Sequence, residues 1–404
     1  MKFRLYLLKR IVEDIFMFPL IMVGRAISFF SPLEKDYAIF FFFPFYHTGG
    51  AEKVHALTAT AIGNKNCIIF FTKKSHNDGM LLKFEKSNCV VKDISRYTDN
   101  KWLYFVNIIF RGIISGYINR QKASPVVFNG QCNFGYKLSP WIRNAVPQIE
   151  LIHSISNFSY IRIPFLPFIN RTIMISQVRI NDHLNLYKDQ GIPSSYGKKI
   201  QFIMNAIDLP LQKPMPKHQN QVLNVLYVGR STPEKRVYLI ARIASLIREA
   251  EANIQFQFLG EVREAIPAEY RHACEFLGNH ENEETINKIY AKAHVLVLLS
   301  DTEGFPMVIM EAMANGLAVV ATGVGEIPLH IKNSVSGFLI ENYLDEKHVE
   351  EKTVEAILRL YGDRKLLGEI SEHNAWYAYK NFGKDRFEKE YRELITDMKR
   401  GAQR

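Results

Sequence analysis

Short runs of apolar residues alternate with longer stretches of helical periodicity along the whole chain. This alternation is typical of parallel α/β sheets, in which each strand is followed by a helix that packs on it. In the first half we expect strands at residues 37–43, 67–71, 125–128, 149–153, 172–176 and 201–204. In the second half we expect strands at residues 222–228, 254–259, 273–277, 294–299, 317–321 and 338–340, with a helix at about 236–250.

One stretch between the two sets of strands breaks the pattern. Residues 209–221 hold three prolines and few apolar side chains, so they form the best candidate linker. At 404 residues the chain is too long for one ordinary core, and two domains are expected. We therefore predict an α/β protein with an N-terminal domain at 1–208, a C-terminal domain at 222–383 and a terminal helix at 384–404.

The expected strands of the second half end in polar or glycine-rich residues. In an open parallel sheet, ligands bind outside the carboxyl ends of the strands. The segment 300–316 (SDTEGFPMVIMEAMANG) is the most unusual of these ends, because Glu303 stands just before a predicted helix and Glu311 lies about a turn and a half into it. Pro306 suits the first helical turn, and a helix start can bind a diphosphate. The alternative is that Glu303 caps the helix and Glu311 is an exposed helical residue.

The segment Glu303-x7-Glu311 resembles the E-x7-E motif of retaining GT-B glycosyltransferases of family 4 (glycosyl transferases group 1). The resemblance implies two facing Rossmann-like domains with a cleft between them and a last helix that crosses back to the first domain. It implies that Glu303 lies near the donor sugar and acts in catalysis, and that Glu311 binds the nucleotide ribose. Gly304, Phe305 and Pro306 would be donor-binding residues of the same loop.

A second segment continues the likeness. Residues 229–235 (GRSTPEK) look like the G-R-x-x-P-E-K segment of the same family, in which Arg230 and Lys235 would hold the donor diphosphate. A guanidinium fork and a lysine point charge suit that task. The alternative is an exposed basic turn. Glu326, in GVGEIP, is a further donor-site candidate, although Val324 replaces a glycine of the family pattern.

The matches in the first half are less specific. Gly49 and Gly50, in HTGGAE, resemble a G-G-x-E loop in which glycine lets the backbone approach the donor and the acceptor closely. The alternative is a tight turn. His153 ends an expected strand where the family often has a histidine near the reaction centre, so we expect it to be catalytic. The alternative is a structural histidine. Ser176 resembles a recurrent strand-end serine. Asn205 stands where the family has P-N-G-V-D, with methionine and alanine for its proline and glycine.

The charge is unevenly placed along the chain. Residues 1–208 hold 26 Lys+Arg and 13 Asp+Glu, a net of +13, and the remainder holds 51 − 26 = 25 against 41 − 13 = 28, a net of −3. Basic charge on one domain indicates an anionic partner. Residues 1–30 combine five basic side chains with an apolar run at 15–24 that is too short to span a bilayer. An interfacial membrane segment and a helix packed on its own domain both fit this stretch.

We expect no nucleic-acid partner, because no recognised motif accompanies the charge. The four cysteines are widely spaced, which fits a reducing, cytoplasmic compartment. No D-x-D metal motif is present, so we expect no metal and no cofactor beyond a UDP- or GDP-sugar as substrate. The anionic partner would then be an acceptor that carries phosphate, together with the inner face of the cell membrane.

The resulting hypothesis is a metal-independent, retaining enzyme that moves a hexose-type sugar to a lipid-linked saccharide in cell-surface polysaccharide or lipopolysaccharide biosynthesis. A GT-B enzyme with a soluble acceptor and a non-catalytic GT-B partner subunit are the alternatives. A nicotinamide-dependent oxidoreductase would need G-x-G-x-x-G after the first strand, which Gly49-Gly50 does not supply.

Overall fold

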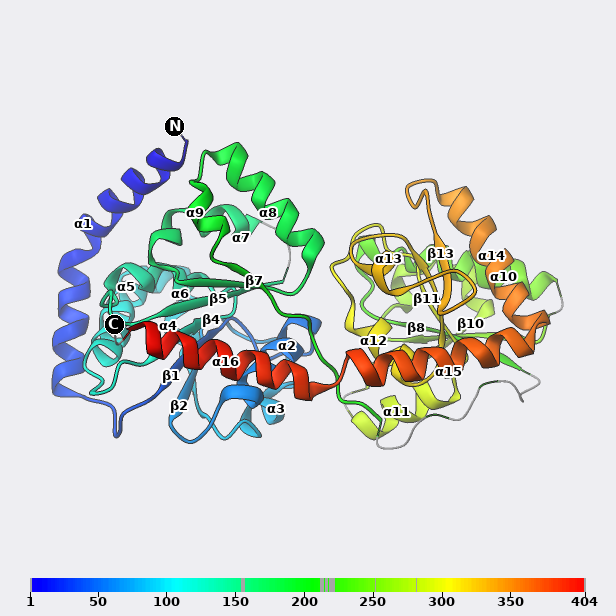
Figure 1. Cartoon of the computed structure of the whole chain (residues 1–404), viewed down its shortest axis with the longest axis horizontal. Coiled ribbons are helices and arrows are strands. Elements are labelled where there is room, and N and C mark those ends of the chain that lie inside the picture. The colour runs from blue at the N-terminus through cyan, green and yellow to red at the C-terminus, as the bar shows by residue number, and fades with distance from the viewer. Residues whose placement is uncertain are drawn as a thin grey trace. The chain divides into compact units, whose positions relative to one another are not determined.

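The computed structural model describes residues 2–153, 157–210, 214, 217, 222–250, 252–280 and 282–402. It divides into two compact units, of which unit 1 comprises Met1–Met204 and Asp385–Arg404 and unit 2 comprises Asn205–Lys384 (Figure 1). The first boundary lies four residues before the expected end of the N-terminal domain. Most of the expected linker, residues 209–221, lies outside the described residues.

Unit 1 is built on a seven-stranded parallel sheet with the order β3-β2-β1-β4-β5-β6-β7. The strands are β1 (Ile39–Phe43), β2 (Cys67–Phe71), β3 (Val90–Asp93), β4 (Val126–Asn129), β5 (Gln148–Ile152), β6 (Arg171–Met174) and β7 (Ile200–Phe202). Strands β1, β2, β4 and β5 are buried throughout, which explains their continuous apolar runs. Strand β3 was not expected from the sequence, because its four residues are partly or fully exposed.

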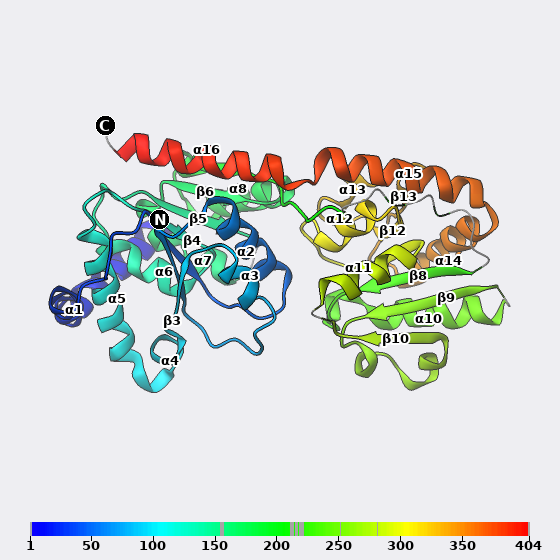
Figure 2. The ribbon, with the colours of Figure 1, turned by 90° about the horizontal axis from the view of Figure 1, so that it is seen from below.

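The helices of unit 1 cover both faces of this sheet. They are α1 (Lys2–Phe30), α2 (Gly50–Ile62), α3 (Leu81–Glu85), α4 (Ser95–Thr98), α5 (Tyr104–Asn119), α6 (Asn133–Leu138), α7 (Asn157–Ile161), α8 (Gln177–Gln190) and α9 (Ser194–Gly197). Figures 1 and 2 show α1 beside α5 at one side of the unit. One face of α1 therefore packs on its own domain, as one reading of residues 1–30 predicted.

The terminal helix α16 (Lys384–Ala402) completes unit 1. Its apolar positions Phe387, Tyr391, Leu394 and Ile395 are all buried. The Tyr391 ring lies 6.2 Å from the ring of Phe128 in β4, and Arg392 Nε donates a hydrogen bond to the Ala61 carbonyl at 3.0 Å. The chain thus returns to its first unit after completing the second, as the predicted fold class requires.

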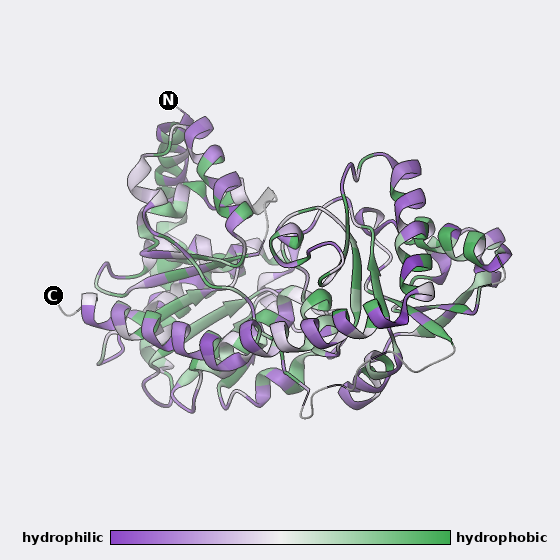
Figure 3. Cartoon of the chain, turned by 45° about the vertical axis from the view of Figure 1, so that its right-hand side comes forward, coloured by the Kyte–Doolittle hydropathy of each residue, from purple (hydrophilic) through white to green (hydrophobic). Residues whose placement is uncertain are grey.

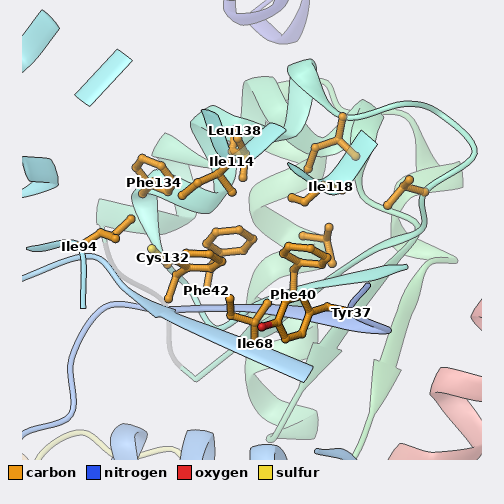
Figure 4. Packing of buried hydrophobic residues seen from close by; sticks show 14 residues of the cluster. Tyr37, Phe40, Phe42, Ile68, Ile94, Ile114, Ile118, Cys132, Phe134 and Leu138 are labelled. Carbon is orange, nitrogen blue, oxygen red and sulfur yellow. The ribbon is translucent and has the colours of Figure 1, made fainter. Parts of the chain in front are cut away.

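The core of unit 1 is rich in aromatic side chains. Figure 4 shows Phe40 and Phe42 of β1 pointing toward Ile114 and Ile118 of α5. The rings of Phe42 and Phe70 are stacked with their centroids 5.6 Å apart. Rings of this size bury a large apolar area, so they join the sheet to its helical layer at a low cost in side-chain entropy.

Unit 2 repeats the architecture with a six-stranded parallel sheet of order β10-β9-β8-β11-β12-β13. Its strands are β8 (Leu223–Val228), β9 (Ile254–Leu259), β10 (Cys274–Gly278), β11 (Val295–Leu298), β12 (Ala318–Thr322) and β13 (Gly337–Ile340), and its helices are α10 (Val237–Glu249), α11 (Glu283–Lys292), α12 (Met307–Ala314), α13 (Ile327–His330), α14 (Glu346–Gly362) and α15 (Arg364–Asn381). The strands of both units are largely hydrophobic in Figure 3.

Each sheet has a point at which the strand order reverses. In unit 1 this point lies between β1 and β4, because β1 pairs with both β2 and β4. In unit 2 it lies between β8 and β11 in the same way. Connections that leave in opposite directions open a crevice at the carboxyl ends of these strands, where α/β proteins bind their ligands. Ligand-binding residues are therefore expected in the loops after β1 and β4 and after β8 and β11.

Candidate functional site

Lys235 and Glu303 form an ion pair across the switch point of unit 2. Lys235 ends the short helical turn Pro233–Lys235 that follows β8, and Glu303 lies in the loop that follows β11. The same carboxylate oxygen of Glu303 accepts a hydrogen bond from Ser300 Oγ at 2.7 Å. Both charged side chains are mostly buried, with 18% and 10% of their surface exposed. The structure thus brings together a lysine and a glutamate that the sequence predicted for one site.

Arg230 lies exposed at the end of β8, beside this pair. Within the described residues its guanidinium has no ion-pair or hydrogen-bond partner, while its carbonyl accepts a hydrogen bond from Tyr227 Oη at 2.7 Å. Burial, reinforced by Glu303, raises the pKa of Tyr227, so this phenol stays neutral and can hold the turn. The backbone of Arg230 is therefore held in place, and its guanidinium is available to bind an anionic ligand.

Glycine is required where the loops after β8 and β9 touch. A Cβ at Gly260 would lie 2.1 Å from the carbonyl oxygen of Gly229, and both residues have positive φ. No other residue type fits two such positions. The backbone can therefore approach a ligand closely at the end of β8.

The loop Glu303–Pro306 is held by its aromatic residue. Phe305 is buried, and its ring is stacked on His330 with centroids 4.1 Å apart. Its side chain therefore anchors the loop to the body of unit 2. Helix α12 begins at Met307, and Pro306 is the residue just before it. The helix therefore begins one residue later than predicted, since we expected Pro306 in its first turn.

The residue before α12 is Pro306, whose side chain makes no cap hydrogen bond at the helix N-terminus. The first backbone N–H groups of α12 carry the partial positive charge of a helix start, a few residues after Glu303, the partner of Lys235. Such a helix start can bind a diphosphate.

Glu311 lies in the middle of α12 and is partly buried. Its Oε2 accepts a hydrogen bond at 3.0 Å from Tyr290 Oη, a buried residue of α11. Burial and the nearby carboxylate raise the pKa of Tyr290, which keeps the phenol as a donor. Glu311 is consequently oriented by the protein and is not a freely solvated helical residue. Tyr290 carries no sequence signal that would have identified it.

Glu326 is buried beside the same loop. Its backbone N–H donates to the Gly304 carbonyl at 2.9 Å. The preceding Gly325 has φ of +59°, and a Cβ there would lie 2.3 Å from that carbonyl oxygen. The glycine that this turn needs is thus Gly325, so Val324 in place of a family glycine does not disturb it.

Arg236 is a site residue that the sequence did not reveal. It adopts a left-handed conformation with φ of +47°, which is uncommon for a residue other than glycine. Its buried side chain donates to the Leu299 carbonyl at 2.6 Å and to the Tyr343 carbonyl at 2.7 Å. Arg236 therefore fixes the loop that holds Lys235 against the end of β11.

In unit 1, the loop after β1 leads into α2 through Gly49 and Gly50. A Cβ at Gly49 would lie 2.2 Å from Glu52 Oε2, whereas a Cβ at Gly50 would meet nothing within 4 Å. The Glu52 side chain thus folds back over Gly49, and Gly50 has open space where a side chain would lie. Glu52 is the acidic residue of the G-G-x-E motif, and its Oε1 lies 3.6 Å from His47 Nε2.

His153 lies at the end of β5 and meets His55 of α2, with their Nε2 atoms 2.9 Å apart. The His55 ring is also stacked on Phe43 of β1 at 4.5 Å between centroids. Burial lowers the pKa of His153 to about 4, and burial and His153 together lower the pKa of His55 well below its usual range. Near neutral pH both rings are therefore uncharged, and one donates its Nε2 proton to the other. His55 was not predicted.

A cavity of about 460 Å³ in unit 1 contains this histidine pair. Glu52, Gly130 and Gln131 line it, together with the four basic side chains Lys73, Lys101, Arg111 and Lys137. Arg111 and Lys137 form no ion pair within the described ranges of the chain, and Arg111 donates to Asn107 Oδ1 at 2.8 and 3.0 Å. Loss of hydration lowers the pKa of both, to about 10 for Arg111. The cavity therefore suits an anionic, polar ligand.

Ser176 and Asn205, whose match to the family pattern is less specific, lie in the following places. Ser176 caps helix α8 through a hydrogen bond from Arg179 N at 3.2 Å. Asn205 is buried just after the end of the unit 1 sheet. In the part of the chain that the structure describes, no group of three or more His, Cys, Asp or Glu side chains is arranged to hold a metal ion.

Comparison with known proteins places the second unit in a family context. The family model described as Glycosyl transferases group 1 matches residues 223–363. An uncharacterised glycosyltransferase of Methanocaldococcus jannaschii is 29% identical over 169 residues, which cover 40% of this chain and 43% of that protein. The lipopolysaccharide 1,2-N-acetylglucosaminetransferase of Salmonella typhimurium is 23% identical over 61% of this chain and 66% of its own.

The chain spans less than half the length of the curated relatives that match it most strongly. The match nevertheless covers the domain that holds Arg230, Lys235, Glu303 and Glu311. The resemblance to group 1 glycosyltransferases, stated from these motifs, is thereby confirmed.

Solved structures extend the fold comparison to both units. HepE of Anabaena, crystallised with UDP and glucose, aligns over 89% of this chain and 99% of its own with a TM-score of 0.71 and 18% identity. The lipopolysaccharide outer core galactosyltransferase WaaB aligns over 89% and 99% with a TM-score of 0.64 and 16% identity. At this identity the alignments establish the fold, and they confirm the GT-B class that was expected.

Proposed function

We propose that the protein is a retaining glycosyltransferase that moves a hexose-type sugar from a UDP- or GDP-sugar to a saccharide acceptor. The observation that carries the proposal is the Lys235–Glu303 pair at the switch point of the domain that matches the glycosyltransferase family. HepE, a neighbour in fold, was crystallised with UDP-glucose, which supports a nucleotide-sugar donor.

The donor would lie at the carboxyl ends of β8 and β11. Glu311 would accept hydrogen bonds from the ribose hydroxyls, and Glu303 from the sugar hydroxyls, each worth about 1.5–3 kcal/mol. Arg230, Lys235 and the start of α12 would bind the diphosphate, and Glu326 would complete the wall beside Gly304. These positive groups stabilise the charge that grows on the leaving diphosphate, so the reaction needs no metal ion. Activity unchanged by EDTA is the expected result.

The acceptor would lie in the cavity of unit 1. In the transfer step the bond between the anomeric carbon and the diphosphate oxygen breaks, and a bond to the acceptor hydroxyl forms on the same face of the sugar. The hydroxyl proton passes to the departing phosphate. His153, neutral because of burial, would hold the reacting hydroxyl by a hydrogen bond, and it would not act as a cationic acid.

The acceptor would carry phosphate. The surplus of +13 over residues 1–208 and the cations that line the cavity support this class of ligand. We propose a lipid-linked saccharide, used at the inner face of the cell membrane in polysaccharide or lipopolysaccharide biosynthesis. The likeness to the Salmonella lipopolysaccharide 1,2-N-acetylglucosaminetransferase and to the lipopolysaccharide outer core galactosyltransferase WaaB supports that setting. A soluble acceptor would use the same donor site but would tolerate loss of the basic cavity residues.

A panel of nucleotide sugars tests the donor role by thermal stabilisation and by product formation. The variant Glu303→Gln keeps the shape of the side chain but not its charge, and we expect sugar transfer to fall on the order of 100-fold. Asp301→Asn removes an exposed carboxylate two residues away and should leave the rate unchanged. Normal transfer by Glu303→Gln would overturn the role of Glu303. Stabilisation by none of the nucleotide sugars would favour a non-catalytic partner subunit.

A further inference from the structure

Helix α1 carries apolar side chains on the side that faces away from the protein. Its inner side is buried at Phe3, Ile21, Gly24 and Ser28. Its outer side holds nine large apolar residues that are each 42% to 83% exposed: Leu5, Leu8, Val12, Ile15, Phe16, Met22, Val23, Ile27 and Phe30. Because these positions recur every three or four residues, they form one continuous row, called here the outer stripe.

The outer stripe is longer than the apolar patches that soluble proteins usually leave exposed. From Leu5 to Phe30 the helix rises about 38 Å at 1.5 Å per residue. The remaining positions along this row, Pro19 and Ala26, are also without polar groups. Soluble proteins seldom expose a contiguous apolar patch of this extent unless another surface or a membrane covers it.

The inner side of α1 fixes the orientation of the stripe. A Cβ at Gly24 would lie 2.1 Å from the Ile109 carbonyl oxygen of α5, and a Cβ at Gly112 would lie 2.2 Å from the Ile21 carbonyl oxygen of α1. A Cβ at Gly116 would lie 2.1 Å from Ser28 Oγ. The backbones of the two helices are thus in direct contact, as in closely packed helix pairs of membranes. The stripe is therefore part of a rigid surface of unit 1.

The charges on α1 indicate what covers the stripe. The helix holds five basic and two acidic residues, and both acids are paired within the helix, Asp14 with Arg10 at 2.9 Å and Glu13 with Lys9 at 3.9 Å. Lys2 and Arg4 remain exposed at its first turn. Among the described residues these two cations form no ion pair, and an apolar row with cations at one end complements an anionic lipid surface. A second copy would oppose two domains of like charge, which the surplus of +13 disfavours.

We propose that α1 lies along the surface of an anionic lipid bilayer, with the outer stripe among the acyl chains and with Lys2 and Arg4 at the lipid phosphates. Among the described residues no helix is long and apolar enough to cross a membrane. The helix thus lies in the interface and holds unit 1 at the bilayer. This surface is separate from the donor loops and the cavity, so the proposal does not depend on the proposed sugar transfer.

Co-sedimentation of the full chain with vesicles tests the proposal. The wild-type protein is expected to bind phosphatidylglycerol-containing vesicles more tightly than vesicles of phosphatidylcholine alone. The variant Ile15→Glu/Phe16→Glu places two charges on the stripe, where the side chains are 66% and 80% exposed, so folding should be unaffected. Its vesicle affinity should fall by at least about tenfold, because two apolar side chains no longer enter the bilayer.

A matched control separates the stripe from exposed apolar surface in general. Leu82→Glu/Leu344→Glu changes two side chains that are 71% and 77% exposed elsewhere on the chain, and it should bind vesicles as the wild type does. Lys2→Gln/Arg4→Gln should weaken binding to the anionic vesicles only. Thermal unfolding and nucleotide-sugar binding should be the same for all variants, which separates this proposal from the one on sugar transfer.

Two results would overturn the proposal. One is wild-type vesicle affinity in Ile15→Glu/Phe16→Glu. The other is a wild-type dimer in light scattering that this variant converts to a monomer, with no vesicle binding by either protein. The second result would make the stripe an interface between copies of this chain.

Discussion

The two units have the same strand order around the centres of their sheets. They differ in the side chains that lie at the carboxyl ends of these central strands. In unit 2 the loops after β8 and β11 supply Lys235 and Glu303, which pair with each other. In unit 1 the corresponding end of the sheet holds the neutral pair His55–His153 and a cavity with the cations Arg111 and Lys137. The topology places a crevice in both units, and the side chains decide which ligand each one can hold.

The units also differ in where they bury an ion pair. Arg162 Nη1 lies 3.2 Å from Glu150 Oε1 inside unit 1, and both side chains are fully buried. Tyr136 Oη and Thr172 Oγ1 donate to the same carboxylate at 2.8 and 2.6 Å. This pair joins β5, which holds Glu150 and ends one residue before His153, to the segment around Arg162. The pair of unit 2 lies at the strand ends and keeps some exposure, so a ligand can reach it.

The largest effect expected from this difference is on folding. Arg162→Met leaves Glu150 buried without a cation, and we expect the free energy of unfolding of unit 1 to fall by about 3–5 kcal/mol. Lys235→Met should lower it by less, about 1–3 kcal/mol, because Glu303 is mostly buried but keeps some exposure to solvent. Urea denaturation of the two variants measures both values. Similar decreases in the free energy of unfolding would contradict the view that the Arg162–Glu150 pair serves stability and the Lys235–Glu303 pair serves ligand binding.

The second effect is on catalysis. Lys235→Met removes a cation from the proposed diphosphate site, and sugar transfer should slow on the order of 100-fold because the leaving group loses stabilisation. Lys292→Met, at the exposed end of α11, removes a lysine of the same unit that lies near the amino ends of β8 and β11, and it serves as the control. Initial rates at saturating nucleotide sugar test the comparison. An equal slowing in both variants would attribute the effect to overall charge.

The fold was largely predictable because several strands are buried throughout, namely β1, β2, β4, β5, β11 and β12. Runs such as IFFFF in β1 or VLVL in β11 leave little ambiguity, since a parallel sheet covered by helices demands them. Strand β3 (VVKD) escaped prediction because it is half-exposed and short, so its sequence is indistinguishable from that of a loop. The boundaries shifted by one or two residues elsewhere, as local patterns alone do not define strand ends.

The two candidate sites differed in how far sequence could reveal them. Glu303 and Glu311 lie in one segment at a strand end, where acidic residues stand out against apolar neighbours. His55 and His153 are 98 positions apart, and His55 lies within a helix whose buried side is mostly apolar. Arg111 is part of an amphipathic helix and has no local pattern that separates it from a solvated arginine. Contacts between distant elements create that part of the site, so only the structure shows it.

The third effect concerns the nucleotide. Glu311→Gln weakens the proposed hydrogen bonds to the ribose, and the KM for the nucleotide sugar should rise about tenfold with kcat nearly unchanged. Tyr290→Phe only removes the donor that orients Glu311, so its KM should rise by a smaller factor. Steady-state kinetics with both variants test this order. A larger effect of Tyr290→Phe would mean that the buried tyrosine itself contacts the donor.

The smallest effect is the acid sensitivity that the buried histidines confer. The pKa of His153 is about 4 in the folded protein, below the value of about 6.5 for an unfolded histidine. As the pH falls from about 6.5 toward 4, the unfolded chain binds a proton that the folded chain does not, so stability decreases by at most about 1.4 kcal/mol per pH unit for this residue. His330 of unit 2, whose pKa burial also lowers to about 4, acts in the same direction.

The free energy of unfolding falls as the pH decreases from 6.5 to 4, and His153→Asn should therefore reduce the slope of this fall. The reduction corresponds to at most one proton, or about 1.4 kcal/mol per pH unit. The substitution should also free the Nε2 atom of His55 from its ring partner, so the remaining histidine titrates at a higher pKa and the slope falls further. His330→Asn should remove no more than one proton equivalent, because within the described residues its imidazole contacts aromatic rings and no second histidine. Urea denaturation at several pH values distinguishes a coupled pair in unit 1 from a single buried histidine in unit 2. Equal slopes for the two variants would contradict the coupling.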